Sequence, residues 1–114
     1  MYFIWEDKSM TVSKAFETFV KEAPAQQAAW MEAVQKLDKA SALDKKTEEI
    51  AYLAVLAAVR LESGLPFHVQ TAKAHGATRE EIISAILVGL PAVGNVVIQS
   101  LPVALEAFDK GESI

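Results

Sequence analysis

The chain has 114 residues, no cysteine and a formal net charge of −4. One domain, residues 1–114, is expected for this length, and the hydrophobic fraction of 52% exceeds the ~45–50% of ordinary soluble domains. An excess of apolar residues in so small a chain predicts a homo-oligomer that buries some of them between subunits. The absence of cysteine excludes disulfides, thiol redox pairs and thiolate metal sites.

The charge pattern and the apolar segments argue against nucleic acid and membrane partners. No basic cluster is present, so binding to a phosphate backbone is not expected. The longest apolar stretch, residues 50–59, is about half of the ~18 residues that a membrane span requires. Met1 to Trp5 lack the positive segment of a signal peptide. We therefore expect a cytoplasmic protein.

Apolar residues recur at helical spacing along most of the chain, and no strand alternation is present. Residues 1–10 are predicted to be extended, either as an arm on a neighbouring subunit or as a segment that closes the chain's own core. A one-sided helix is predicted from Val12 to Val20. Pro24 ends it or begins a second helix, which continues to about Leu37.

The third predicted helix, residues 45–62, is the most apolar of the chain. Asp44 is its predicted N-cap, and the unbroken apolar run from Ile50 to Val59 leaves it without a solvent-facing side. A helix that is apolar all round is buried on most sides. We therefore place this helix at the centre of the core or of a subunit interface.

The next two helices are predicted from their capping residues. Pro66 suits the first position of a fourth helix, and Gly76 is placed to end that helix in a left-handed conformation. Thr78 and Glu81 have the spacing of a capping box, which predicts that a fifth helix begins there.

The end of the chain is predicted to be one loop and one helix. Gly89 to Gly94 reads as a loop, because it contains two glycines and a proline. Asn95 is expected to cap a last helix that reaches about Lys110 and kinks at Pro102. The chain is thus predicted to be all-α, with about six helices.

His68 is the first candidate for chemistry, as the third residue of the fourth predicted helix. Free backbone N–H groups and the positive helix end lie nearby and favour a neutral imidazole, which can act as a base. Histidine is also the usual acid or base near neutral pH. A surface or interface histidine without a chemical role fits the same position.

Glu49 is the second candidate, because it shares a helical stripe with Tyr52 and Arg60. A carboxylate, a phenol and a guanidinium are therefore expected along one side of a buried helix. Glu49 could instead be exposed near the helix start, where negative charge is favourable, with Glu48 facing inward. Arg60 could hold an anion or pair with Glu62 or Glu49.

His75 follows His68 by seven residues on the same helical face, near the helix end, where a cation is favourable. Two histidines without a carboxylate at ligand spacing make a poor metal site, so no metal is expected. Phosphate-binding loops, the dinucleotide motif and the nucleophile elbow are all missing. No cofactor is expected either.

The residue types and their spacing from Glu49 to Glu81 resemble those of the carboxymuconolactone decarboxylase and alkylhydroperoxidase D (AhpD) superfamily. Its thiol branch carries a glutamate, a C-x-x-C pair and a histidine, then a glycine at the helix end and a capping box. The corresponding residues of this chain are Glu49, Leu61, Gly64, His68, Gly76, Thr78 and Glu81. The two thiol positions are thus occupied by residues without sulfur.

The segment from Gly89 to Asn95 is similar to the G-x-P-A-x-x-N loop of the decarboxylase branch, and the resemblance covers about residues 43–108. It implies an AhpD-like all-α bundle that assembles into trimers or hexamers. It also implies that Glu49 and His68 handle protons. Because the thiols are missing, these residues cannot reduce peroxides or exchange disulfides as the thiol branch does.

Three functions remain from this resemblance. The first is a cofactor-free lyase that acts on a small organic acid or lactone, with His68 as acid or base, Glu49 orienting it and Arg60 holding a carboxylate. The second is a non-catalytic binding or structural oligomer that has lost the thiol site. The third is an AhpD-like antioxidant role through a partner's thiols, which the absence of cysteine disfavours.

Overall fold

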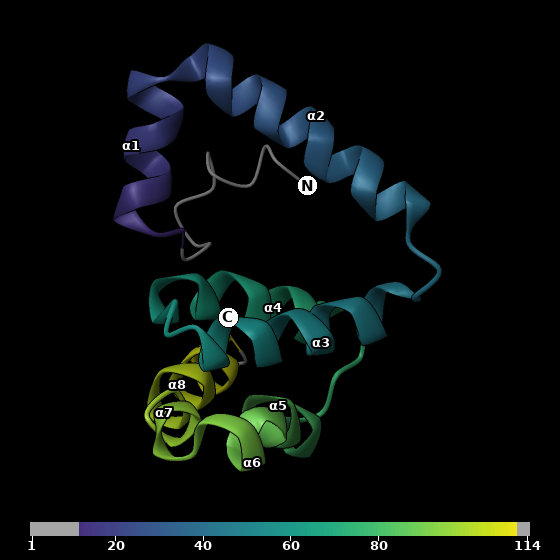
Figure 1. Cartoon of the computed structure of the whole chain (residues 1–114), viewed down its shortest axis with the longest axis vertical. Helices are drawn as coiled ribbons and strands as arrows, with labels where there is room; N and C mark the ends of the chain where they lie inside the picture. The colour runs from purple at the N-terminus through teal and green to yellow at the C-terminus, as the bar shows by residue number, and fades with distance from the viewer. Residues whose placement is uncertain (1–11, 112–114) are drawn as a thin grey trace. The chain divides into compact units, whose positions relative to one another are not determined.

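A computed structural model describes residues 12–111 of the chain (Figure 1). Its contacts divide the chain into two compact units, unit 1 at Met1–Leu43 and unit 2 at Asp44–Ile114. Every regular element of the described residues is helical, which confirms the predicted all-α class. None of these helices is long and apolar enough to cross a membrane. The segment predicted to be extended, residues 1–10, lies outside the described residues.

Unit 1 contains the two helices α1 (Lys14–Glu22) and α2 (Pro24–Ala40). The Ser13 hydroxyl caps α1 by accepting a hydrogen bond from the Phe16 backbone N–H at 3.1 Å. Phe16 meets Phe19 edge to face, with 6.1 Å between ring centroids. The predicted helix boundary at the proline is confirmed, and neither helix contains a buried residue.

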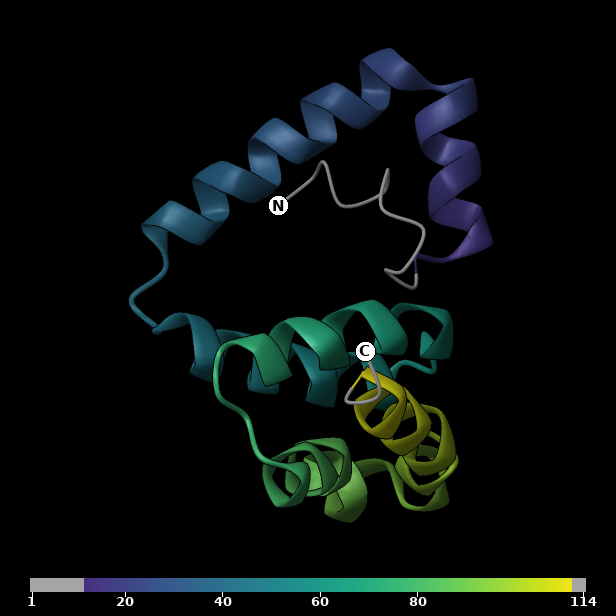
Figure 2. The same ribbon diagram turned by 180° about the vertical axis from the view of Figure 1, so that it is seen from behind.

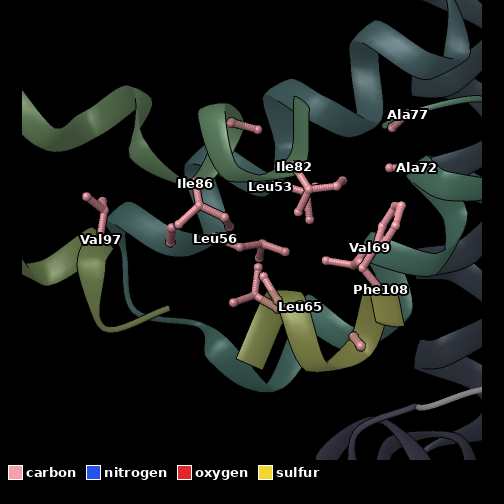
Figure 3. Close-up of a cluster of buried hydrophobic side chains, with 14 residues drawn as sticks. Leu53, Leu56, Leu65, Val69, Ala72, Ala77, Ile82, Ile86, Val97 and Phe108 are labelled. Carbon is pink, nitrogen blue, oxygen red and sulfur yellow. The ribbon is translucent and has the colours of Figure 1, made fainter. Parts of the chain in front are cut away.

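Unit 2 holds the hydrophobic core. Its elements are α3 (Lys45–Ala58), η2 (Glu62–Gly64), α4 (Leu65–Ala74), α5 (Arg79–Ile86), η3 (Leu87–Gly89), α6 (Leu90–Val93), α7 (Asn95–Ile98) and α8 (Leu101–Gly111). Helices α3, α4, α5 and α8 pack against one another, as seen from both sides in Figures 1 and 2. Figure 3 shows the apolar side chains that meet between them, among them Leu53, Leu56, Leu65, Val69, Ile82, Ile86, Val97 and Phe108.

The local capping signals of the sequence are confirmed. The Asp44 side chain accepts a hydrogen bond from the Thr47 backbone N–H at 2.8 Å, and this bond lowers the pKa of the Asp44 carboxyl. Thr78 and Glu81 form the complete capping box at the start of α5. Gly76 follows α4 with a φ of 98°, a conformation that glycine adopts without steric cost. These signals fix where α3 and α5 begin and where α4 ends.

The last part of the chain differs from the prediction in two places. The segment expected to be a loop, Gly89 to Gly94, contains α6 instead. The expected single kinked helix is two helices, α7 and α8, and Pro102 is the second residue of α8. A proline has no N–H to continue a helix but is tolerated in a first turn. Asn95 is the first residue of α7, and its side chain forms no capping hydrogen bond.

Helix α3 is buried on one side only in the single chain. Leu53 and Leu56 lie in the core, whereas Tyr52, Val55 and Val59 are exposed by 44%, 55% and 56%. The exposed residues have the i, i+3, i+7 spacing of one helical face. Helix α3 therefore contributes to the core of unit 2 with one side, and the prediction that its other side lies in a subunit interface stays a prediction.

Candidate functional site

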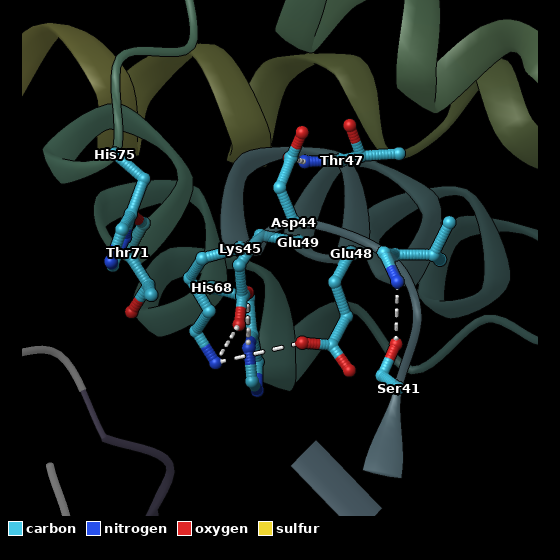
Figure 4. A network of polar contacts seen from close by, with 10 residues as sticks. Ser41, Asp44, Lys45, Thr47, Glu48, Glu49, His68, Thr71 and His75 are labelled. Atoms are coloured by element: carbon cyan, nitrogen blue, oxygen red, sulfur yellow. Dashed lines mark hydrogen bonds and ion pairs between the residues drawn. The ribbon is translucent and has the colours of Figure 1, made fainter. Parts of the chain in front are cut away.

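Glu49 and His68 lie together where α3 packs against α4. Nδ1 of the His68 ring is 3.1 Å from Oε1 of Glu49, and Figure 4 shows the two side chains directed at each other. Glu49 belongs to the second turn of α3. His68 is the fourth residue of α4, one position later than predicted, because Leu65 rather than Pro66 begins the helix. The packing of two adjacent helices thus brings the two candidate residues into hydrogen-bond contact.

Glu49 is the buried member of the Glu48–Glu49 pair, with only 5% of the residue exposed. A carboxylate removed from water needs partners for its charge and its lone pairs. One oxygen has the His68 ring, and the other, Oε2, lies 3.5 Å from Nζ of Lys45. Nζ of Lys45 also lies 3.8 Å from a Glu48 oxygen. Both oxygens of the buried carboxylate are therefore engaged.

The His68 ring lies between two aromatic side chains and retains access to solvent. Its centroid is 4.5 Å from that of Tyr52 and 5.0 Å from that of Phe67, both at edge-to-face angles. The His68 side chain is 22% exposed. Because an ionised carboxylate only accepts hydrogen bonds, Glu49 assigns the ring proton to Nδ1. In the neutral ring, Nε2 then carries the lone pair that can take up a proton.

Two neighbours of this pair were not identified from the sequence. Lys45 precedes Glu49 by four residues, the spacing of helical ion pairs, so a sequence signal for it existed. Phe67 is adjacent to His68 in the chain, and its ring contact depends on how α4 is oriented against α3. We refer to Lys45, Glu49, Tyr52, Phe67 and His68 together as the dyad site.

Arg60 lies apart from the dyad site, beyond the C-terminal end of α3. The nine residue-to-residue steps from Glu49 to Ala58 rise ~13 Å along the helix at ~1.5 Å per step. Among the described residues, the Arg60 side chain forms an ion pair with neither Glu49 nor Glu62. It lines a separate surface pocket with Asn95 and other residues. Arg60 therefore does not continue the expected stripe of Glu49 and Tyr52, because the helix ends before it.

His75 has a structural explanation. It is the C-cap residue of α4, and its Nδ1 lies 2.9 Å from the Thr71 carbonyl oxygen in an exposed position. An N–H of the ring there adds a second hydrogen bond to a carbonyl group that also accepts from the His75 backbone N–H at 3.2 Å. Within residues 12–111, no three histidine, aspartate or glutamate side chains gather as a metal site would require.

The two positions of the missing thiols lie just before α4. Leu61 is 55% exposed and precedes η2, and Gly64 is the N-cap residue of α4. Neither residue carries a group that titrates or reacts with peroxide. Sulfur chemistry is therefore not available at these two positions, and His68 is the candidate acid or base of the dyad site.

Comparisons with known proteins agree with this architecture. The model of the carboxymuconolactone decarboxylase family matches residues 24–106. The fold is similar to the crystal structure of the apo form of a carboxymuconolactone decarboxylase family protein from Legionella pneumophila. That similarity has a TM-score of 0.72 and 31% sequence identity, and covers 84% of this chain and 86% of the other. No curated protein matches the chain.

Proposed function

The chain belongs to the carboxymuconolactone decarboxylase family, and from this membership and the dyad site we propose that it is a cofactor-free lyase acting on a small organic acid or lactone. The observation that carries the proposal is the hydrogen bond between the buried Glu49 carboxylate and Nδ1 of His68. A buried carboxylate that orients a histidine is a recurrent arrangement in acid–base catalysis.

In the proposed reaction His68 transfers the proton. When a carboxylate leaves as carbon dioxide, its bond to the substrate carbon breaks and the electron pair stays on that carbon. The protonated His68 ring donates its Nε2 proton to this carbon, and the ring takes a new proton from solvent. Glu49 holds Nδ1 and offsets the positive charge of the ring while it is protonated. No oxidant or reductant is needed.

The aromatic neighbours of His68 support the same reaction. Tyr52 and Phe67 pack edge to face with the imidazole, at 4.5 and 5.0 Å between centroids. A substrate carboxylate placed against such apolar surface loses hydration, which favours its departure as neutral carbon dioxide. Lys45, 3.5 Å from Glu49 and 3.8 Å from Glu48, offsets part of the negative charge of these two glutamates, which lowers their repulsion of a substrate carboxylate.

The proposal is tested by measuring carbon dioxide release by the purified protein from carboxymuconolactone and other small lactone acids. His68→Ala should lose turnover by at least about 100-fold, the usual contribution of a general acid. His75→Ala is the matched control, because that histidine is exposed at the helix end, and it should retain the activity. Unchanged turnover in His68→Ala would refute the assignment.

A second function is a non-catalytic, oligomeric binding or structural protein. The exposed face of α3, formed by Tyr52, Val55 and Val59, favours contact between subunits whether or not the dyad site is active. This alternative predicts no carbon dioxide release from any lactone acid. An antioxidant role through a partner's thiols is the third alternative, and Leu61 and Gly64 supply no sulfur for it.

The chain is also proposed to form homo-oligomers, with a trimer or a hexamer as the expected state. The support is the exposed apolar face of α3 together with the hydrophobic fraction of 52% in a chain of 114 residues. Its location in the cytoplasm and the absence of nucleic acid and membrane partners remain predictions from the sequence.

A further inference from the structure

Helices α3 and α4 end in the same backbone motif, but with different residues at its strained position. After α4, the Gly76 N–H donates to the Lys73 carbonyl at 3.0 Å, and the Ala77 N–H donates to the Ala72 carbonyl at 3.0 Å. This pair of bonds defines a Schellman motif, in which glycine usually occupies the left-handed residue. Gly76 has a φ of 98°.

After α3 the left-handed residue is Arg60, with a φ of 65°. Its N–H donates to the Ala57 carbonyl at 3.3 Å, and the Leu61 N–H donates to the Leu56 carbonyl at 2.9 Å, which completes the same motif. A side chain at positive φ crowds the backbone, and such strain is concentrated at functional sites. An arginine where glycine would relieve the backbone therefore points to a task for its guanidinium.

Arg60 forms one wall of a surface pocket of about 450 Å³. The residues lining this pocket, named here the Arg60 pocket, are Arg60, Glu62, Val93, Asn95, Val96 and Gln99. All of them belong to unit 2, and none belongs to the dyad site. The walls thus offer one cation, one anion and two carboxamides, which both donate and accept hydrogen bonds.

The two charges of the Arg60 pocket are available to a ligand. Among the described residues, neither the Arg60 guanidinium nor the Glu62 carboxylate forms an ion pair or a hydrogen bond with another side chain. A guanidinium binds a carboxylate through two parallel hydrogen bonds, and a carboxylate binds an ammonium group. A ligand that carries both charges can therefore bind to both wall charges, whereas a ligand with one charge binds to only one of them.

We propose that the Arg60 pocket binds a small zwitterion, with its carboxylate on Arg60 and its ammonium group on Glu62. Asn95 and Gln99 complete the polar walls and can hydrogen-bond to the same ligand. This site is independent of the proton transfer proposed for His68. Its test therefore requires no knowledge of the substrate and no catalytic activity.

The test uses nitrogen-15 NMR of the full chain, with β-alanine as the zwitterionic probe. The side-chain NH₂ resonances of Asn95 and Gln99 report directly on the Arg60 pocket. We expect β-alanine to shift both at concentrations of about 10 mM, the range of weak ligands. Propionate and propylamine carry only one of the two charges and should bind about tenfold more weakly. Equal shifts from all three probes, or none from β-alanine, would overturn the proposal.

Two variants separate loss of the ligand from loss of the fold. Arg60→Gly suits the left-handed backbone, so its thermal midpoint should equal or exceed that of the natural chain, while the β-alanine shifts disappear. Glu62→Gln should weaken β-alanine binding about tenfold and leave propionate binding no weaker. Glu80→Gln is the control, because Glu80 is an exposed residue of α5 outside the Arg60 pocket. It should change neither the thermal midpoint nor the binding of β-alanine. Shifts that persist in Arg60→Gly, or a lower midpoint of that variant, would count against the proposal.

Discussion

The carboxylate of Glu49 lies 3.1 Å from the ring of His68, although the two residues are nineteen positions apart in the chain. Glu49 is almost fully buried, Lys45 lies 3.5 Å from its second oxygen, and a carboxylate oxygen accepts the Nδ1 proton of the ring. The contact therefore selects one tautomer of the neutral histidine, with Nε2 left as the base.

This tautomer can be measured by nitrogen-15 NMR of the neutral His68 ring. The natural chain should show a protonated Nδ1 and an unprotonated Nε2. In Glu49→Gln the side-chain amide can both donate and accept, so the ring should show a mixture of tautomers. Glu80→Gln is the control, because Glu80 is an exposed residue of α5 outside the dyad site, and it should leave the spectrum unchanged. A predominantly Nε2-protonated ring in the natural chain would contradict the assignment.

The exposed face of α3 predicts how assembly responds to substitution. Val55→Lys places a charged group at the centre of this face, and the cost of burying it should shift the protein toward monomers. Light scattering coupled to size exclusion measures the mass. Val88→Lys changes an exposed valine outside α3 in the same way and should leave the mass unchanged. A natural chain that is monomeric at all concentrations would refute the proposed oligomer.

Ser100 predicts a stabilising substitution in unit 2. The residue is fully buried, and its hydroxyl has no hydrogen-bond partner among residues 12–111. A buried hydroxyl without a partner lowers stability, so Ser100→Ala should raise the free energy of unfolding by about 1 kcal/mol. Urea denaturation measures the change. Ser84→Ala, an exposed serine on α5, should have almost no effect. Destabilisation by Ser100→Ala would show that the hydroxyl is satisfied in solution.

The helix caps predict the response to acid. The backbone N–H of Thr47 lowers the pKa of Asp44 below its ordinary value of 3.8. The native state therefore binds this proton less readily than the unfolded state does. The contribution of Asp44 to stability is complete above the ordinary pKa and is lost as the pH falls through the lowered native value. The pKa values of Glu81 and Asp109 are lowered too, by the Thr78 backbone and by the Arg79 side chain.

Asp44→Asn isolates this effect, because asparagine caps a helix but does not titrate. The advantage of the natural chain over the variant in urea midpoint should be constant near neutral pH and shrink below about pH 4. Two parallel curves of midpoint against pH would mean that Asp44 does not gain stability from its ionised form.

The parts of the fold that the sequence predicted are those set by neighbours in the chain. Asp44, Gly76 and the Thr78–Glu81 box act through hydrogen bonds that span a few residues, so their spacing alone was sufficient. The break between α7 and α8 was missed, because a proline permits both a kinked helix and the start of a new one. Which of these forms depends on packing around Val97 and Ser100, both fully buried.

The same distinction between local and long-range contacts explains which features of the candidate site could be predicted from the sequence. Family resemblance indicated Glu49 and His68, but their contact depends on the packing of α3 against α4. Arg60 was placed on the stripe of Glu49 by extending the helix to residue 62. The helix ends at Ala58, and the left-handed turn at Arg60 moves that side chain off the stripe. Glycine usually marks such a left-handed position in a sequence. Because Arg60 occupies it here, the sequence did not indicate that the helix ends there.

Two substitutions, Leu61→Cys and Gly64→Cys, would place thiols where the thiol branch of the superfamily carries them. The φ of Gly64 is −87°, which any residue adopts, and a Cβ atom added there would meet Leu56 methyl groups at 3.6 Å, an ordinary contact distance. Leu61 is already half exposed. Cysteines could therefore be introduced at both positions without rebuilding the backbone, which makes this chain a scaffold for grafting a redox pair just before the helix that carries His68.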